Sequence, residues 1–253
     1  MRIMKFIAFS TGLLLLSACG AVPSTVLPTN EATTPSTTPA TYAPDKMVAL
    51  TFDDGPNTTT MVEILDLLKE YDAKATFFVI GKKVDDTTTP VLQRALDEGH
   101  EIANHSMNHE KMAEMTDEQI LFEVSECQKV VKDAVGIDMY YFRAPFASIN
   151  DRMFELIDMP FVRSAAVAQD GTIGSLAADR AWRITTGVYD GAIAGMHCFN
   201  GNDATVEALK TILPELEAQG YEFVTLTELY TRSDAQIPVP AHGVIYIDNK
   251  PQN

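Results

Sequence analysis

Hydrophobic residues between positions 46 and 231 recur in two patterns, which predict alternating strands and helices. Short β-prone runs predict strands at Val48–Phe52, Ala75–Ile80, Glu101–Asn104, Tyr140–Arg143, Phe161–Val167, Ala192–His197 and Glu222–Thr225. Between them, apolar residues three and four positions apart predict amphipathic helices at Met61–Tyr71, Asp117–Val135 and Ala204–Gln219. Strands separated by helices in this way favour an α/β barrel around one core.

The first residues carry a different pattern, which is typical of an export signal. Arg2 and Lys5 are followed by an apolar run, Ile7–Leu16, that is short for a membrane span, and then by small residues. The segment Leu16–Cys19 resembles the bacterial lipobox, in which cleavage leaves the cysteine first and its thiol receives a diacylglycerol. We therefore expect a signal peptide at 1–18, a lipidated Cys19 and an extracytoplasmic, membrane-anchored lipoprotein of a bacterium. The alternative is an ordinary cleaved signal in which Cys19 is incidental.

Residues 19–45 predict a tether, because beyond Cys19 they are almost entirely Thr, Pro, Ser and Ala without an apolar period. As a coil, this stretch would span roughly 25 to 30 Å, which would hold the domain close to a membrane and within reach of a cell wall. We expect the catalytic domain at 46–231. The remaining residues, 232–253, form either a final strand or a loose C-terminal tail, and their sequence indicates no function.

Charge and cysteine content narrow the classes of function. The net charge of −16 disfavours nucleic-acid binding through phosphate contacts, which requires a basic surface. Cys127 and Cys198 lie far apart in the sequence, so we expect buried, unpaired side chains rather than a disulfide. We expect a monomer whose partners are a substrate and, through the lipid, a membrane.

Two adjacent carboxylates, Asp53 and Asp54, end the first predicted strand, in the segment Thr51–Pro56. Functional groups of an α/β barrel gather where strands end and loops begin. Adjacent acids repel each other unless a cation or a shared proton relieves the repulsion. An exposed acidic turn is the alternative interpretation of an Asp-Gly sequence seen alone.

Two histidines, His105 and His109, follow the third predicted strand. A spacing of four places both imidazoles on one face of a helical turn, close enough to share a metal. A zinc-protease motif is disfavoured because Ser106 stands where that motif has its catalytic Glu. With one carboxylate from the first strand, two histidines make an open site for a divalent ion.

Four segments in this order resemble the polysaccharide deacetylase family, also called NodB-homology or carbohydrate esterase family 4. They are Thr51–Pro56, Asn104–His109, Phe142–Phe146 and Ile193–His197. The resemblance covers roughly residues 46 to 230 and implies a distorted barrel of about seven β/α units. It also implies that the enzyme is a hydrolase that removes acetyl groups from a polysaccharide.

The resemblance assigns a role to each matching residue. It gives the metal ligands as Asp54, His105 and His109, the general base as Asp53 and the general acid as His197. A metal-activated water would attack the acetyl carbonyl, Asp53 would accept its proton, and His197 would protonate the departing amine or alcohol. Zinc is the expected metal, and cobalt, nickel and manganese suit the same ligands.

Further residues follow from the same resemblance. Arg143 would orient Asp53 and keep it ionised, and the backbone N–H of Phe146, after Pro145, would stabilise the oxyanion. Asp170 can polarise His197. Alternatives from the residues alone are a surface salt bridge for Arg143 and a satisfied core histidine at position 197.

The chain departs from the family pattern around the substrate pocket. Gly171 stands where the family has a tryptophan, and Trp182 lies on a predicted helix. Gly195 and Met196 replace leucines of the acetyl pocket, so we expect a pocket of different shape with Met196 in it. We expect N-acetylglucosamine of peptidoglycan or a chitin-like glycan as the substrate. Acetylated xylan is the alternative, and a carbohydrate-binding homologue with lost turnover is a second one.

Overall fold

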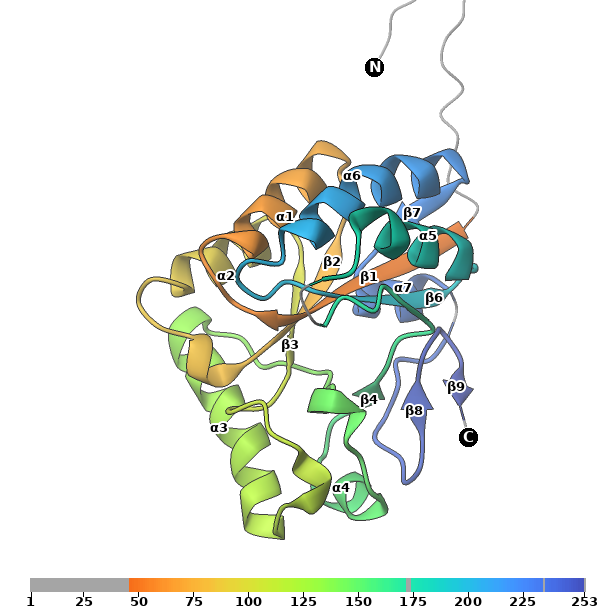
Figure 1. The fold of residues 1–253 in the computed structure, drawn as a ribbon. Coiled ribbons are helices and arrows are strands. Elements are labelled where there is room, and N and C mark those ends of the chain that lie inside the picture. The colour runs from red at the N-terminus through yellow and green to blue at the C-terminus, as the bar shows by residue number, and fades with distance from the viewer. Residues whose placement is uncertain (1–45, 172–173, 234, 253) are drawn as a thin grey trace, which may run out of the picture. The chain divides into compact units, whose positions relative to one another are not determined.

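A single long strand, β1, organises the fold. The computed structural model describes residues 46–171, 174–233 and 235–252. In it, β1 (Lys46–Gly55) pairs in parallel with β2 (Ala75–Val79) on one side and β6 (Ala192–His197) on the other. The sheet order is β3-β2-β1-β6-β5, with β3 at Glu101–Asn104 and β5 at Ala166–Val167, and β7 (Tyr221–Phe223) pairs with the start of β1. All these strands are parallel, so their carboxyl ends meet at one edge (Figure 1).

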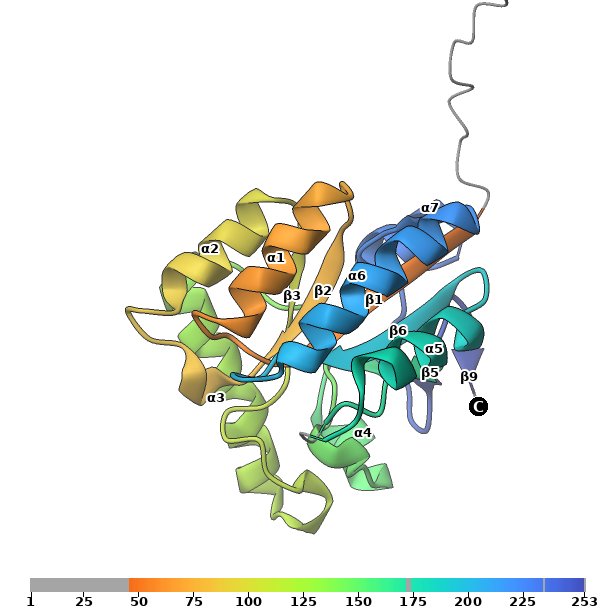
Figure 2. The same ribbon diagram turned by 45° about the horizontal axis from the view of Figure 1, so that its top comes forward.

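Helices cover the outer face of this sheet, as Figures 1 and 2 show for α1, α5 and α6. In α1 the buried residues Met61, Ile64, Leu65 and Leu68 follow the helical period, which confirms the prediction for this segment. The helix α3 begins at a capping box formed by Thr116 and ends at Gly136 in the left-handed conformation. The helices are α1 (Thr60–Glu70), α2 (Thr89–Asp97), α3 (Asp117–Val135), α4 (Asp151–Leu156), α5 (Ala177–Gly187), α6 (Asp203–Ala218) and α7 (Leu226–Arg232).

Alternation along the strands divides the apolar residues between two cores. Val48, Leu50 and Phe52 of β1 pack in the outer core beneath the helices. Ala49 points the other way, into an inner core that contains Phe78 and side chains of α7. Because side chains of a strand alternate between its faces, Thr51 and Asp53 lie on the inner side with Ala49. The site residues of β1 are therefore directed to the interior of the barrel.

The barrel is distorted because two predicted strands are fragmentary. Only Phe142 of Tyr140–Arg143 makes bridges, to Asn104 and Phe161. The predicted strand Phe161–Val167 is divided into β4 (Phe161–Val162) and β5, since Arg163–Ala165 between them leave the ladder. These bridges connect β3 through Phe142 to β4, and the structure agrees with the predicted distorted α/β barrel.

The C-terminal segment is part of the barrel wall. Strand β8 (Ile245–Tyr246) pairs in parallel with β4, and β9 (Pro251–Gln252) pairs with β8. Tyr246 is buried in the inner core, and the N–H of Ile193 in β6 donates to the Ile247 carbonyl. Of the two alternatives that the sequence left for residues 232–253, the structure shows the final strand.

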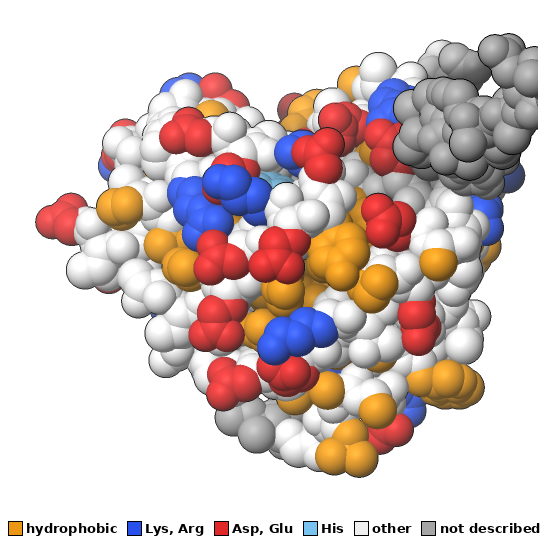
Figure 3. Space-filling model, turned by 90° about the horizontal axis from the view of Figure 1, so that it is seen from above, with side chains coloured by type: hydrophobic (Ala, Val, Ile, Leu, Met, Phe, Trp, Pro, Cys, Tyr) orange, Lys and Arg blue, Asp and Glu red, His pale blue; other side chains and the backbone are white. Residues whose placement is uncertain are grey.

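The surface over the helices mixes side chains of both charges with hydrophobic ones (Figure 3). Among the described residues, no helix has the length and apolar character needed to cross a membrane. The signal peptide, Cys19 and the tether lie outside the described residues.

Candidate metal centre and catalytic site

A β-bulge brings the two adjacent carboxylates to the same site. Along the β1–β2 pair, Asp53 is opposite Phe78 and Gly55 is opposite Val79, so Asp54 has no partner in the ladder. Asp54 also has a φ of 71°, in the left-handed region. Neighbouring residues of a regular strand point to opposite faces, and the bulge removes that constraint. Both carboxylates consequently line one pocket.

The histidines come from a loop after β3, and the predicted helical turn is wrong. Ser106 and His109 have positive φ values of 67° and 58°, which no α-helical turn allows. The loop is held instead by side chains: Asn104 Oδ1 accepts from the Ser106 N–H, and Ser106 Oγ accepts from the His109 N–H. The buried Glu123 of α3 accepts from the Asn108 N–H at 2.7 Å. Tertiary contacts therefore bring the two imidazoles together.

Three donor atoms converge as a metal centre requires. The Nε2 atom of His109 lies 3.0 Å from Asp54 Oδ1, and that of His105 lies 3.6 Å from it. The Nδ1 atom of His105 lies 2.7 Å from the Arg143 carbonyl, which fixes the proton on Nδ1 and leaves the Nε2 lone pair toward Asp54. Asp54 Oδ1 is buried, and the Nε2 atoms of the two histidines are the polar atoms beside it.

The charge state of the ligand set also fits a cation. Burial by itself raises the pKa of Asp54, but the hydrogen bond from His109 and the charges of both histidines lower it to about 2. Burial lowers the pKa of His105, which favours the neutral, ligating form. An ionised carboxylate and two imidazoles in mutual reach suit a divalent ion such as zinc.

Arg143 fixes the second carboxylate, Asp53. Its Nη1 atom donates to Asp53 Oδ1 at 2.6 Å and to Thr51 Oγ1 at 2.9 Å. Its Nε atom donates to the Val162 carbonyl, and its guanidinium lies 4.0 Å from the centre of the Phe78 ring. Arg143 is buried, so the surface salt bridge considered from the sequence is wrong. A buried charge pair of this kind holds the acid in one orientation.

A second polar network holds His197 at the end of β6. Asp170 Oδ1 lies 2.8 Å from His197 Nδ1, and Asp170 Oδ2 accepts from the His197 N–H. Thr205 Oγ1 donates to Asp170 Oδ2, and the buried Arg180 donates to Thr205 Oγ1. Burial lowers the pKa of His197, but the hydrogen bond to Asp170 and the charges of Asp53 and Asp170 raise it to about 9. The ring therefore carries a proton at neutral pH.

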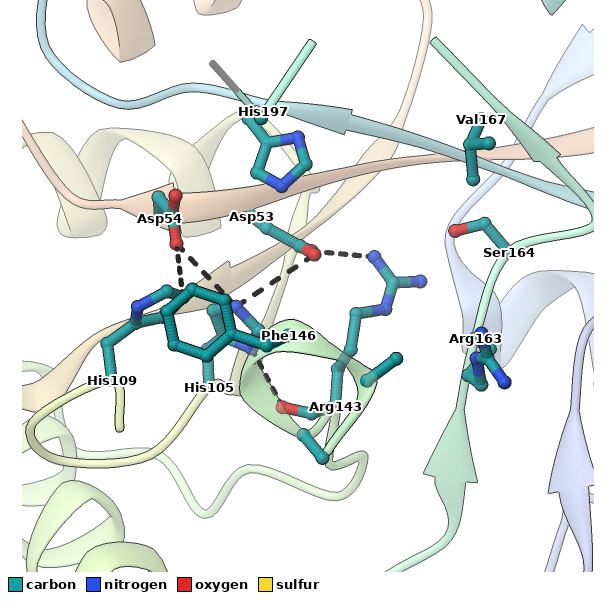
Figure 4. A pocket seen from close by; sticks show the side chains of 13 residues that line it. Asp53, Asp54, His105, His109, Arg143, Phe146, Arg163, Ser164, Val167 and His197 are labelled. Atoms are coloured by element: carbon teal, nitrogen blue, oxygen red, sulfur yellow. Dashed lines mark hydrogen bonds and ion pairs between the residues drawn. The ribbon is translucent and has the colours of Figure 1, made fainter. Parts of the chain in front are cut away.

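Asp53, Arg143, His197 and the three candidate metal ligands line one pocket (Figure 4), whereas Asp170 contacts it only through His197. The lining residues are Asp53, Asp54, His105, His109, Arg143, Ala144, Phe146, Ala147, Arg163, Ser164, Val167, Gly171 and His197. No sequence pattern indicated the wall of Arg163, Ser164 and Val167, because the residues of Phe161–Val167 predict one regular strand. The break between β4 and β5 directs this wall into the pocket.

Two predicted pocket residues lie elsewhere. Met196 is buried in the outer core, since it alternates with His197 along β6 and points to the opposite face. Its prediction as an acetyl-pocket residue is wrong. Pro145 is buried and does not line the pocket, while Phe146 after it is exposed and contacts the His109 ring at 4.6 Å between centroids. The Phe146 backbone is left-handed, with a φ of 57°.

The two glycines of the altered motifs open the pocket. A Cβ atom at Gly171 would lie 3.2 Å from His197 Cε1, so any larger residue there would contact His197. A Cβ atom at Gly195 would collide with the Ser164 side chain. Trp182 is exposed on α5 and does not replace the missing wall. Cys127 and Cys198 are buried and unpaired, as expected.

Comparisons with known proteins show the family to which this chain belongs. The family model for polysaccharide deacetylase matches residues 40–159. A peptidoglycan-N-acetylglucosamine deacetylase of Bacillus cereus is 38% identical over 191 residues, which are 73% of this chain and 88% of the relative. The chain belongs to the polysaccharide deacetylase family. The family predicted from the sequence is thereby confirmed.

Two further family members resemble this chain in sequence or structure. A bifunctional xylanase/deacetylase of Pseudobutyrivibrio xylanivorans is 40% identical over 185 residues, which are 73% of this chain but only 30% of that protein. A solved family 4 acetyl xylan esterase of Clostridium thermocellum, in complex with a cobalt ion, has a TM-score of 0.77 and 38% identity. That likeness covers 80% of this chain and 98% of the esterase.

Proposed function

We propose that this deacetylase-family member is a metal-dependent hydrolase that removes acetyl groups from an extracellular polysaccharide. The observation that carries the proposal is one pocket with three parts: the ligand set Asp54, His105 and His109, an Arg143-bound Asp53, and an Asp170-bound His197. Binding a glycan alone requires neither a fixed base nor a protonated acid. This combination therefore disfavours a homologue that only binds carbohydrate.

Each group has a chemical task. A divalent ion held by Asp54, His105 and His109 would polarise the acetyl carbonyl and lower the pKa of a water. Asp53 is held in place by Arg143 and accepts the proton of the attacking water. His197, protonated through Asp170, donates a proton to the departing amine or alcohol.

The turn after Arg143 supplies the proposed oxyanion donor. Phe146 has a left-handed backbone within η3 (Pro145–Ala147) and lines the pocket beside His109. A backbone N–H in such a turn is fixed before the reaction, so it can stabilise developing negative charge without reorganisation. This task requires no hydroxyl, which is consistent with phenylalanine at position 146.

We propose N-acetylglucosamine of peptidoglycan as the substrate, with zinc as the metal. The Bacillus cereus relative supports the glycan, and a tether ending in a lipidated Cys19 would keep the domain near the wall. Acetylated xylan is the second candidate, favoured by the structural likeness to the Clostridium thermocellum esterase. Both reactions use the same groups.

Acetate release is the test. Purified protein is stripped of metal, reloaded with zinc or cobalt, and given chitooligosaccharides, peptidoglycan and acetylated xylan. We expect metal-dependent release from peptidoglycan above the other substrates, and its loss in Asp53→Asn. The matched control is Asp86→Asn, an exposed residue outside the pocket. Absence of metal-dependent release from all three substrates would contradict the proposal.

The anchor has a separate test. Mass spectrometry of the protein from a bacterial membrane should show a diacylglyceryl group on an N-terminal Cys19. Cys19→Ala should move the protein out of the membrane fraction. An unmodified protein cleaved at another position would show that Cys19 is incidental.

A further inference from the structure

The wall between β4 and β5 offers hydrogen-bond donors that the proposed mechanism does not use. Arg163 and Ser164 follow β4 directly, and both line the pocket. Neither side chain has a hydrogen bond or ion pair with the residues that the structure describes.

Arg143 adds a third unused donor on the same side. Its Nη1 atom is paired with Asp53, whereas its Nη2 atom is buried and has no partner among the described residues. Figure 4 shows the Arg143 guanidinium between Asp53 on one side and Ser164 on the other, with Arg163 beside Ser164. A buried donor without an acceptor is costly, so the position favours an oxygen atom from a ligand or solvent.

Backbone contacts hold this wall in place. The Arg163 N–H donates to the Tyr246 carbonyl of β8 at 2.8 Å, which fixes the segment between two strands. Ser164 occupies space that a side chain at position 195 would fill, so Gly195 allows the hydroxyl to face the pocket. The same glycine that departs from the family pattern thus makes room for the donors.

We propose that Arg163, Ser164 and Arg143 Nη2 form a subsite for a carboxylate carried by the polysaccharide substrate. The inference rests on the proposed function, because the carboxylate belongs to a sugar next to the acetylated one. A guanidinium binds a carboxylate through two parallel hydrogen bonds, and a neutral hydroxyl can make only one of them. Two sources have this chemistry: the lactyl carboxylate of peptide-free muramic acid, and a uronic acid branch.

The test compares each acidic glycan with its carboxyl-reduced form, in which a primary alcohol replaces the acid. Substrates are a peptide-free glycan of N-acetylglucosamine and muramic acid, and an acetylated glucuronoxylan. For at least one of them, we expect kcat/KM for acetate release to be about 10-fold higher with the carboxylate than with the alcohol. The pair that shows this ratio identifies the source.

Variants show whether the wall is responsible. Arg163→Gln should bring the ratio close to one by lowering the value for the acidic form, and Arg163→Lys should retain part of the preference because it keeps the charge. The control Arg183→Gln changes an arginine of α5 that does not line the pocket, and it should keep the full ratio. A ratio near one in the unmodified protein, or an unchanged ratio in Arg163→Gln, would overturn the subsite.

Binding of the deacetylated glycans separates this proposal from the proposed function. Titration calorimetry with the product oligosaccharides requires no turnover. Tighter binding of the acidic than the reduced product, lost in Arg163→Gln, supports the subsite even when no acetate is released from any substrate. Equal binding of both products, with acetate release intact, overturns the subsite and leaves the deacetylase function standing.

Discussion

Replacing Asp170 by asparagine should convert the general acid into a group that is deprotonated at mildly basic pH. The carboxylate accepts from the His197 N–H at 2.9 Å and lies 2.8 Å from His197 Nδ1. Its negative charge and hydrogen bond counter the effect of burial and contribute to the raised pKa of His197, about 9. Without that charge and hydrogen bond, the pKa should fall from about 9 toward the ordinary value of 6.5, although the charges of Asp53 and Asp54 still raise it.

The size of the effect follows from the protonated fraction. At pH 8, a histidine with a pKa of about 9 is roughly 90% protonated, and one with a pKa of 6.5 is roughly 3% protonated. Because the acid works only when protonated, Asp170→Asn should lose up to about 30-fold in kcat/KM on a glycan at pH 8 and little at pH 6. The charges of Asp53 and Asp54 act on His197 in both proteins, so the difference between the two pH profiles reports Asp170.

The assay is the pH profile of acetate release, with para-nitrophenyl acetate as a second substrate. Nitrophenolate departs without a proton, so the ester should respond much less to the variant than the glycan does. Asp179→Asn, an exposed acid on α5, is the matched control, and thermal unfolding checks that each variant is folded. An unshifted basic limb in Asp170→Asn, or equal losses on glycan and ester, would refute the role of Asp170 in protonating His197.

Three further predictions concern the metal, the pocket wall and a buried histidine. His109→Ala should lose one equivalent of bound zinc, as measured by elemental analysis, and its activity should fall by roughly 100-fold or more. In the unmodified protein, zinc at 100 times its Kd should raise the free energy of unfolding by about 2.7 kcal/mol. Gly195→Ala should lower the free energy of unfolding in urea by about 1 to 3 kcal/mol, because its Cβ atom would lie 2.7 Å from Ser164 Cβ. A second change, Ser164→Gly, should restore part of that stability. Full stability of Gly195→Ala alone would show that the wall can move. Burial, and then the positive charges of Lys74 and Arg94, lower the pKa of His100 to about 4. The unfolded chain binds this proton below about pH 6.5, so stability should fall by up to about 3 kcal/mol as the pH falls from 6.5 to 4, and His100→Gln should show a smaller fall in the same denaturant titrations.

The elements that the sequence predicted well are those whose residues follow one local period. The helix from Thr60 to Glu70 buries every apolar residue of its stripe, and β1 is a nearly continuous apolar run because parallel strands are covered on both faces. The fragmentary strands around Phe142 and Ala166 were predicted less well. The short strand β4 between them pairs with the C-terminal strand β8, more than 80 positions away in the chain.

The candidate site was likewise predicted only in part. Side-chain chemistry and motif order named Asp53, Asp54, His105, His109, Arg143, Asp170 and His197, and the structure brings all of them into one pocket or into contact with it. The sequence did not show how they meet. The histidine loop is fixed by Glu123 of a distant helix, and the bulge at Asp54 is visible only against the pairing of β1 with β2.

The sequence alone determined the family, the fold class and the residues proposed as reactive groups, because these depend on residue type, spacing and local period. Only the tertiary structure decided which neighbours face the substrate. Met196 and Gly195 are adjacent in the chain, yet alternation along β6 directs one into the outer core and the other toward Ser164. Arg163 carries no motif, and it lines the pocket because the chain leaves the sheet between β4 and β5. Contacts between distant segments set these directions, and no local pattern records them.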